Sequence, residues 1–105
     1  MWNPPSEELL NQVPRLYSTE HVPLKEKVIW LHFFFGGCDW YISEYDGDDL
    51  FFGYAVLNDD LPNSEWGYIS FFELKDINIY GFEVDRDVYW QPTPAGEIDR
   101  IRDWV

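Results

Sequence analysis

Hydrophobic and polar residues follow different periods along the chain, and these periods predict helices near both ends with strands between them. Ser6 precedes Glu7 and Glu8, so it suits the N-cap of a short helix, which Pro14 ends. Residues 28–35 form a continuous run of β-branched and aromatic side chains. Such a run is typical of a strand buried on both faces.

Turn residues divide the following segments into further strands. Gly36 and Gly37 form one turn, and the acidic sequence at 46–49 is a strong hairpin signal. The strands predicted on this basis cover residues 28–35, 39–45, 50–57 and 65–71. Gly53, inside the third of these strands, indicates a bulge or a close approach of the backbone.

The C-terminal third predicts shorter elements. Residues 72–76 suit one helical turn, and residues 79–90 suit a strand pair or one bent strand. Thr93 and Pro94 favour the start of a C-terminal helix that ends at Trp104. The links between strands are too short for parallel crossovers. We therefore expect one domain over residues 1–105, of the α+β class, with a mainly antiparallel sheet of four to six strands and short N- and C-terminal helices.

Composition narrows the class of protein. The 105 residues are 46% hydrophobic, which suits a single packed core. Cys38 is the single cysteine, so no internal disulfide is expected. Residues 1–5 lack the basic and apolar regions of a signal peptide, and the longest apolar run is too short to span a membrane. We expect a cytoplasmic protein without a membrane partner.

Charge is the most unusual property of the chain. Twenty acidic residues against seven basic ones give a net charge of −13. This charge disfavours contact with nucleic acid or anionic lipid, and it favours a basic host protein as partner. No basic residue occurs between Lys27 and Lys75. The predicted partner-binding residues are six acids of this stretch and three of the segment after it: Glu44, Asp46, Asp48, Asp49, Asp59, Asp60, Glu83, Asp85 and Asp87.

One part of this acidic set predicts mimicry of nucleic acid. Alternate residues of a strand face one way, about 6.6 Å apart. Glu83, Asp85 and Asp87 would therefore form a row whose spacing is comparable with that of neighbouring phosphates. Such a surface would occupy the basic groove of a protein that binds DNA or RNA.

Aromatic residues supply a second candidate surface. They make up 20% of the chain. One sheet with two short helices is not expected to cover all of these rings, and the uncovered ones would form an exposed patch. Aromatic side chains with an acidic rim suit a protein-binding hot spot. The residues predicted for this aromatic interface are Trp40, Tyr41, Trp66 and Trp90.

Conventional catalytic sets are missing from the sequence. His21 lies in a polar connector, His32 in an apolar strand, and Cys38 has only acids nearby, so no activated nucleophile is expected. The turn at 46–49 lacks the remaining acids of a calcium loop, and no Cys/His set suits zinc. We expect no metal, no cofactor and no enzymatic activity.

Two alternatives to a partner-binding acidic surface stay open. Glu44, Glu65 and Glu73 would form a catalytic or ligand-binding set if adjacent strands brought them together in an aromatic cleft. Alternatively, the acidity serves only solubility, and the chain is an accessory protein. The first alternative requires a concave pocket, whereas the second requires acids that are scattered evenly.

Several ordered phrases resemble a known bacterial family, the domain of unknown function 2958 (DUF2958). They are Pro14-Arg15-Leu16-Tyr17 with Thr19-Glu20, Trp40-Tyr41 with Glu44-Tyr45-Asp46, Leu50-Phe51-Phe52-Gly53-Tyr54, Glu65-Trp66-Gly67-Tyr68-Ile69-Ser70 with Glu73-Leu74, and Asp85-Arg86-Asp87 ahead of Pro92-Thr93-Pro94. The resemblance implies a small stand-alone protein, often carried on mobile genetic elements, with no established activity. Together with the charge, it suggests an acidic inhibitor of a host defence system (anti-CRISPR or anti-restriction).

Overall fold

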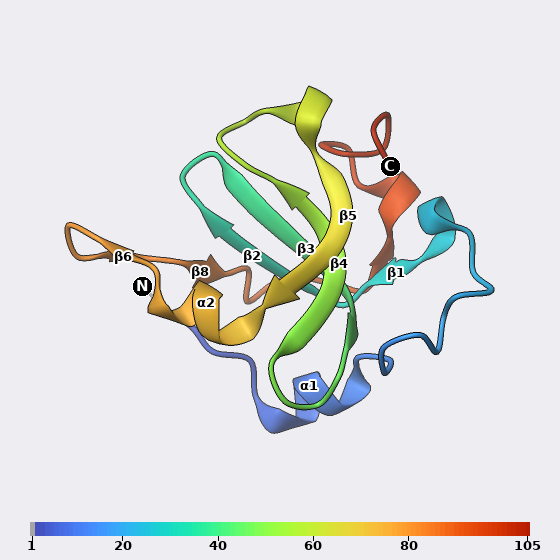
Figure 1. The fold of residues 1–105 in the computed structure, drawn as a ribbon, viewed down its shortest axis with the longest axis horizontal. Coiled ribbons are helices and arrows are strands. Elements are labelled where there is room, and N and C mark those ends of the chain that lie inside the picture. Colours follow the sequence, from blue (N-terminus) through green and yellow to red (C-terminus); the bar gives the residue numbers. More distant parts are fainter. Residues whose placement is uncertain (1) are drawn as a thin grey trace.

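The computed structural model describes residues 2–105 and places a five-stranded antiparallel sheet at the centre of the molecule (Figure 1). Its strands are β2 (Leu31–Phe35), β3 (Cys38–Tyr45), β4 (Leu50–Val56), β5 (Glu65–Ser70) and β8 (Asp85–Arg86). They lie in the order β5-β4-β3-β2-β8, so the first four strands of this sheet form a meander. The α+β class and the antiparallel sheet predicted from the sequence are confirmed.

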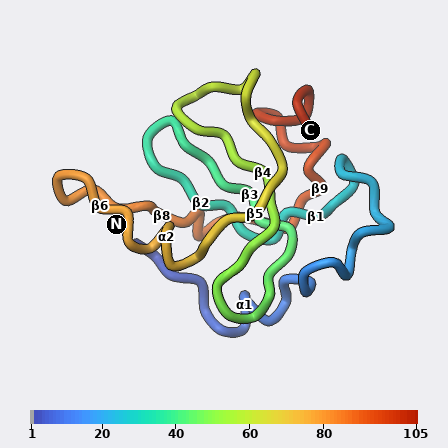
Figure 2. The backbone as a smooth tube through the Cα atoms, in the orientation of Figure 1, coloured from blue at the N-terminus to red at the C-terminus, as the bar shows by residue number. Residues whose placement is uncertain are grey.

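Short elements surround this sheet (Figure 2). In chain order they are α1 (Glu7–Gln12), the 3₁₀ helix η1 (Leu24–Glu26), β1 (Val28–Ile29), η2 (Leu61–Asn63), α2 (Phe71–Asp76), β6 (Asn78–Ile79), β7 (Phe82–Glu83), β9 (Thr93–Pro94) and η3 (Ala95–Glu97). β1 pairs with β9, and β6 pairs with β7. Ser6 caps α1 as predicted, because its side chain accepts a hydrogen bond from the amide of Leu9.

Both faces of the central sheet are buried, which explains why β3 has almost no exposed residue. The first face packs against α1 and α2 through a core of Val13, Leu31, Phe33, Trp40, Ile42, Tyr45, Phe51, Ile69, Leu74 and Val84. The second face packs against the C-terminal segment through Ile29, Tyr41, Tyr54, Val56, Ala95, Ile98 and Ile101. Neighbouring residues of β3 and β4 alternate between these two cores, as the pleat of a strand requires.

The structure differs from the sequence prediction at two places. The strand predicted at 28–35 is divided after Ile29, because β1 leaves the central sheet to pair with β9. The helix predicted from Thr93 to Trp104 does not form as one helix, because Thr93 and Pro94 belong to β9. The chain then forms η3 and two further turns, the first of which is closed by hydrogen bonds to the carbonyl of Ile98.

Gly53 lies opposite a β-bulge, which confirms the prediction for this position. The register shifts between Ile42 and Glu44, so that Ile42 pairs with Gly53 while Glu44 pairs with Phe52. A Cβ atom at Gly53 would lie 2.1 Å from the carbonyl oxygen of Tyr41. The bulge moves Glu44 to the sheet face opposite that of Ile42, and bulges often re-aim a side chain in this way.

Candidate functional site

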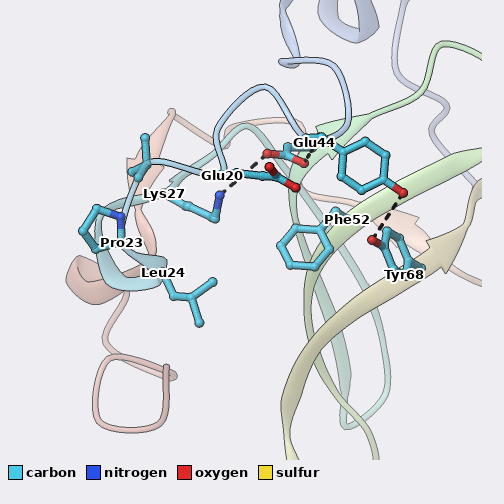
Figure 3. A pocket seen from close by; sticks show the side chains of 9 residues that line it. Glu20, Pro23, Leu24, Lys27, Glu44, Phe52 and Tyr68 are labelled. Carbon is cyan, nitrogen blue, oxygen red and sulfur yellow. Dashed lines mark hydrogen bonds and ion pairs between the residues drawn. The ribbon is translucent and has the colours of Figure 1, made fainter.

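A groove of about 430 Å³ lies beside the bulge, between the connector at residues 17–27 and strands β3, β4 and β5 (Figure 3). Its lining residues are Tyr17, Glu20, Val22, Pro23, Leu24, Lys27, Glu44, Phe52 and Tyr68. A volume in this range is typical of sites for small ligands or single side chains.

The register of the sheet builds the floor of the groove. Glu44 pairs with Phe52, and Phe52 pairs with Tyr68, so the three side chains form a row across three strands on one face. The connector adds Tyr17, whose hydroxyl lies 3.5 Å from that of Tyr68. Hydrogen bonding to Tyr17 raises the pKa of Tyr68 above its ordinary value. The groove therefore has three aromatic rings along its wall.

Glu44 and Lys27 form a buried ion pair at the inner end of the groove. The carboxylate of Glu44 lies 3.6 Å from the Lys27 ammonium, and both side chains are nearly inaccessible. Lys27 also donates hydrogen bonds to the carbonyl and the hydroxyl of Thr19, at 2.5 Å and 2.7 Å. The Thr19 hydroxyl in turn donates to Glu44. Each charged group of this pair is thus satisfied inside the protein.

The pKa of Glu44 is set by opposing effects. Burial raises it, but the hydrogen bonds from the Thr19 hydroxyl and from the amides of Tyr17 and Thr19, together with the charge of Lys27, outweigh burial. The pKa therefore lies below the ordinary value, and Glu44 is ionised at neutral pH. An ionised Glu44 can accept these hydrogen bonds and pair with Lys27.

Glu44 also fixes the conformation of the connector. Tyr17 has a φ of 70°, which is unusual for a bulky residue. The Glu44 carboxylate accepts hydrogen bonds from the amides of Tyr17 and Thr19, at 2.9 Å and 3.2 Å. These bonds hold the strained turn that places Tyr17 beside Tyr68.

Glu20 differs from Glu44 in its exposure. Its side chain is exposed at the groove, and no hydrogen bond or ion pair links its carboxylate to another side chain of residues 2–105. Glu20 and Phe52 point toward the same space in Figure 3. Since Lys27 offsets the charge of Glu44, the groove has one uncompensated negative charge beside aromatic rings, an arrangement suited to a cation.

The acids predicted to bind a partner do not form one continuous surface. Asp46, Asp48 and Asp49 lie in the turn before β4, whereas Asp59 and Asp60 lie in the loop after it (Figure 1). The seven residues of β4 separate the two turns by roughly 20 Å. Glu44, also in the predicted set, is buried in the groove instead.

Asp46 and Asp49 both have structural contacts, Asp46 within its own turn and Asp49 with the residues that begin α2. One carboxylate oxygen of Asp46 accepts hydrogen bonds from the amides of residues 48–50 at 2.8 Å, 3.0 Å and 3.0 Å. These bonds, the one from Asp48 first, lower the pKa of Asp46. Asp49 accepts hydrogen bonds from the Ser70 hydroxyl and, at 2.6 Å, from the amide of Phe72 at the start of α2.

The predicted row of three acids is not a continuous exposed row. Glu83 belongs to β7 and Asp85 to β8, and the chain changes its pairing partner at Val84, which is fully buried. All three acids are half-buried. Asp85 accepts a hydrogen bond from the side chain of Asn3 at 2.6 Å, and an oxygen of Asp87 lies 3.8 Å from Nδ1 of His32.

The predicted aromatic interface is wrong for two of its residues. Trp40 and Tyr41 lie in the first and second cores, because β3 is covered on both faces. Trp66 and Trp90 are half-buried against the second core, and the indole of Trp90 donates a hydrogen bond to the carbonyl of Ile29 at 2.9 Å. The exposed aromatic residues are Tyr17, Phe34, Tyr68, Phe72, Tyr80, Phe82, Tyr89 and Trp104.

The alternative set of three glutamates is not brought together. Glu65 pairs with Ala55, so it faces away from the row formed by Glu44 and Phe52. Glu73 is exposed on α2. Of the three, Glu44 alone lines the aromatic groove that this alternative requires.

Sequence reasoning missed most of the groove. Tyr17, Glu20, Lys27 and Phe52 were not predicted as site residues, because they come from segments far apart in the chain. The phrases that resemble a known family offered a signal, since they contain all of these residues except Lys27. The groove is therefore built mainly from the segments that carry that resemblance.

These features define a small α+β protein with an acidic, aromatic groove. The chain belongs to the family described as "Protein of unknown function (DUF2958)", whose model matches residues 8–96. No match was found among curated proteins or among solved structures. Within residues 2–105, every helix is too short or too polar to cross a membrane.

Proposed function

We propose that this protein is a non-enzymatic binding protein whose groove takes a cationic side chain from a basic protein partner. The observation that carries the proposal is the exposed carboxylate of Glu20, which lacks a partner among residues 2–105 and lies with Tyr17, Phe52 and Tyr68 around one groove. An arginine side chain fits this arrangement, because its guanidinium group stacks on aromatic faces and binds carboxylates through paired hydrogen bonds.

The ion pair of Lys27 and Glu44 supports this role rather than catalysis. Both groups are buried and bound to each other and to Thr19. The carboxylate of Glu44 accepts three hydrogen bonds and the ammonium of Lys27 donates two, all within the protein. Their contribution is to position the connector, so that Tyr17 and Glu20 lie over the sheet.

The surface charge favours a basic partner over a neutral one. Fourteen acidic residues are exposed, against four exposed basic residues, within the described chain. These acids are distributed over helices, turns and the C-terminal segment. A field of this kind speeds the approach of a positively charged protein, whereas the groove supplies the specific contact.

Calorimetric titration with a hexa-arginine peptide tests the proposal. We expect saturable binding that weakens as the salt concentration rises, because exposed charges are screened. Glu20→Gln should weaken binding about tenfold, since a charge-assisted hydrogen bond is lost. The matched control is Glu65→Gln, which removes the same charge from the other face of the sheet. Equal effects of the two variants would show that only bulk charge matters, as the solubility alternative requires.

A narrower role within this function is inhibition of a nucleic-acid-binding host defence complex, as an anti-CRISPR or anti-restriction protein. Its support is the net charge of −13 and the mobile-element context that the family resemblance implies. Capture of such a complex in a salt series, with DNA or RNA as competitor, tests this role. If nucleic acid does not displace the protein from the complex, mimicry of nucleic acid is ruled out, whereas the binding function is not.

A further inference from the structure

A two-stranded arm, formed by β6 and β7 at residues 78–83, projects from the body of the protein (Figures 1 and 2). Ile79 and Phe82 are the last residue pair before its tip, and Tyr80 and Gly81 form the turn. The exposed fractions are 51% for Ile79, 97% for Tyr80 and 71% for Phe82. The arm therefore presents three large apolar side chains to solvent.

The tip has a backbone conformation that does not suit its sequence. Tyr80 has a φ of 53° and Gly81 a φ of 84°, the positive pair of angles found in type I′ hairpin turns. Asn, Asp or Gly is preferred at the first of these positions, because a bulky side chain is strained there. Glycine is present at the second position and tyrosine at the first.

The Asn78 side chain closes the turn by accepting a hydrogen bond from the amide of Gly81 at 2.9 Å, but no contact of this kind involves the Tyr80 side chain. The Tyr80 ring makes no aromatic contact, and its hydroxyl forms no hydrogen bond, with any of residues 2–105. Residues with strained backbone angles cluster at functional positions. The strained residue is also the most exposed large hydrophobic side chain among residues 2–105.

A shallow hollow of about 370 Å³ lies between the arm and the edge of the central sheet. The end of strand β2 contributes Phe34 and Phe35 to its lining, and the arm contributes Ile79, Tyr80 and Phe82. Glu83 lies at its border and forms no ion pair or side-chain hydrogen bond within residues 2–105. The surface is thus apolar with an acidic border.

We infer that this arm is an apolar anchor that inserts into a hydrophobic pocket bordered by basic residues on the protein partner. Charge indicates which kind of molecule binds the arm. A second copy of this chain carries the same charge of −13 and is repelled. Anionic lipid and nucleic acid are repelled for the same reason. The inference rests on the proposed function for the basic character of the partner, but it concerns a different surface.

Two peptides of equal positive charge separate this inference from the proposed function. One consists of lysine and glycine, and the other is an amphipathic helix of lysine and leucine. In calorimetric titrations, both should lose affinity in Glu20→Gln, which tests the groove. We expect the amphipathic peptide to bind the native protein at least about tenfold more tightly than the lysine-glycine peptide.

Variants of the arm then test the anchor. Tyr80→Asn and Phe82→Ser should remove the advantage of the amphipathic peptide and leave the affinity of the lysine-glycine peptide unchanged. The matched control is Tyr89→Asn, because Tyr89 is 87% exposed and lies outside the arm. Tyr80→Asn should also raise the thermal unfolding midpoint by about 4 °C, since Asn suits the turn better.

Three results would overturn the inference. The first is an amphipathic advantage that survives Tyr80→Asn and Phe82→Ser. The second is an equal loss in Tyr89→Asn. The third is a dimer in sedimentation experiments that Tyr80→Asn dissociates, because the arm would then bind a second copy. The first result, together with weaker binding of both peptides in Glu20→Gln, would support the groove and contradict the anchor.

Discussion

The carboxylate of Glu44 lies 3.6 Å from the ammonium of Lys27, although the exposed fractions of the two side chains are only 5% and 6%. Thr19 contacts both groups, through its hydroxyl and its carbonyl. This cluster joins the connector to β3 at the bulge. Burial of a charge is unfavourable unless it is paired and hydrogen-bonded, so the three residues depend on one another.

Removing one partner of this pair should destabilise the protein strongly. Lys27→Met leaves Glu44 as a buried charge without its cation, and we expect a loss of about 3–5 kcal/mol in the free energy of unfolding. Urea denaturation followed by tryptophan fluorescence measures this loss. The control is Lys25→Met, because Lys25 is exposed on the neighbouring 3₁₀ helix. A loss below about 1 kcal/mol for Lys27→Met would mean that the pair is not buried in solution.

Acid should weaken the folded state through the same cluster. The pKa of Glu44 is lower in the folded protein than the ordinary value of 4.5, which holds for the unfolded chain. Its contribution is therefore fully present above about pH 4.5 and is lost as the pH falls through the folded pKa. Glu44→Gln should be less stable than the native protein at pH 7, and the difference should narrow toward pH 3. Urea titrations between pH 3 and pH 7 measure how the free energy of unfolding of each protein depends on pH. If the two proteins show the same pH dependence, the prediction is contradicted.

The two paired glycines of β4 and β5 should respond differently to alanine. A Cβ at Gly53 would lie 2.1 Å from a backbone oxygen, whereas one at Gly67 would meet no atom within 4 Å. Gly53→Ala should cost about 3 kcal/mol or more, because backbone atoms must shift. Gly67→Ala should change stability by less than about 1 kcal/mol. Thermal unfolding of both variants makes the comparison, and a neutral Gly53→Ala would be inconsistent with the bulge geometry.

Arg100 should matter more than Arg102, although both pair with aspartates. Arg100 bonds Asp39 at 2.8 Å and Asp59 at 2.7 Å, and Asp39 is buried, whereas Arg102 reaches the exposed Asp99 at 3.4 Å. We expect Arg100→Met to cost about 1–3 kcal/mol and Arg102→Met less than about 0.5 kcal/mol. Chemical denaturation of the two variants checks the order, and equal losses would contradict the buried network around Asp39.

Local sequence signals predicted most of the fold. Ser6, the glycines at 36 and 37 and the acidic turn at 46–49 act within a few residues of their own position, and each begins or ends an element as expected. The C-terminal segment was harder to predict from local signals, because its conformation depends on pairing with β1, more than sixty residues earlier. Local capping by Thr93 and Pro94 is weaker than this tertiary contact.

The site could be predicted only in fragments. Glu44 was recognised as a candidate, but its partners Thr19 and Lys27 lie in a connector whose path no local pattern specifies. The bulge that turns Glu44 into the groove depends on Gly53 in the next strand. The acids at 46–49 were prominent in the sequence, yet Asp46 accepts hydrogen bonds within its own turn and Asp49 accepts one from the start of α2.

Amide chemical-shift mapping with the hexa-arginine peptide tests the central claim most directly. If the groove binds a cationic side chain, the shifts should concentrate at Tyr17, Glu20, Phe52 and Tyr68, which line it. At equal peptide concentration they should be smaller in Glu20→Gln and persist unchanged in Glu65→Gln. Shifts that spread over the acidic turns at 46–49 and 57–60, with none in the groove, would contradict the account.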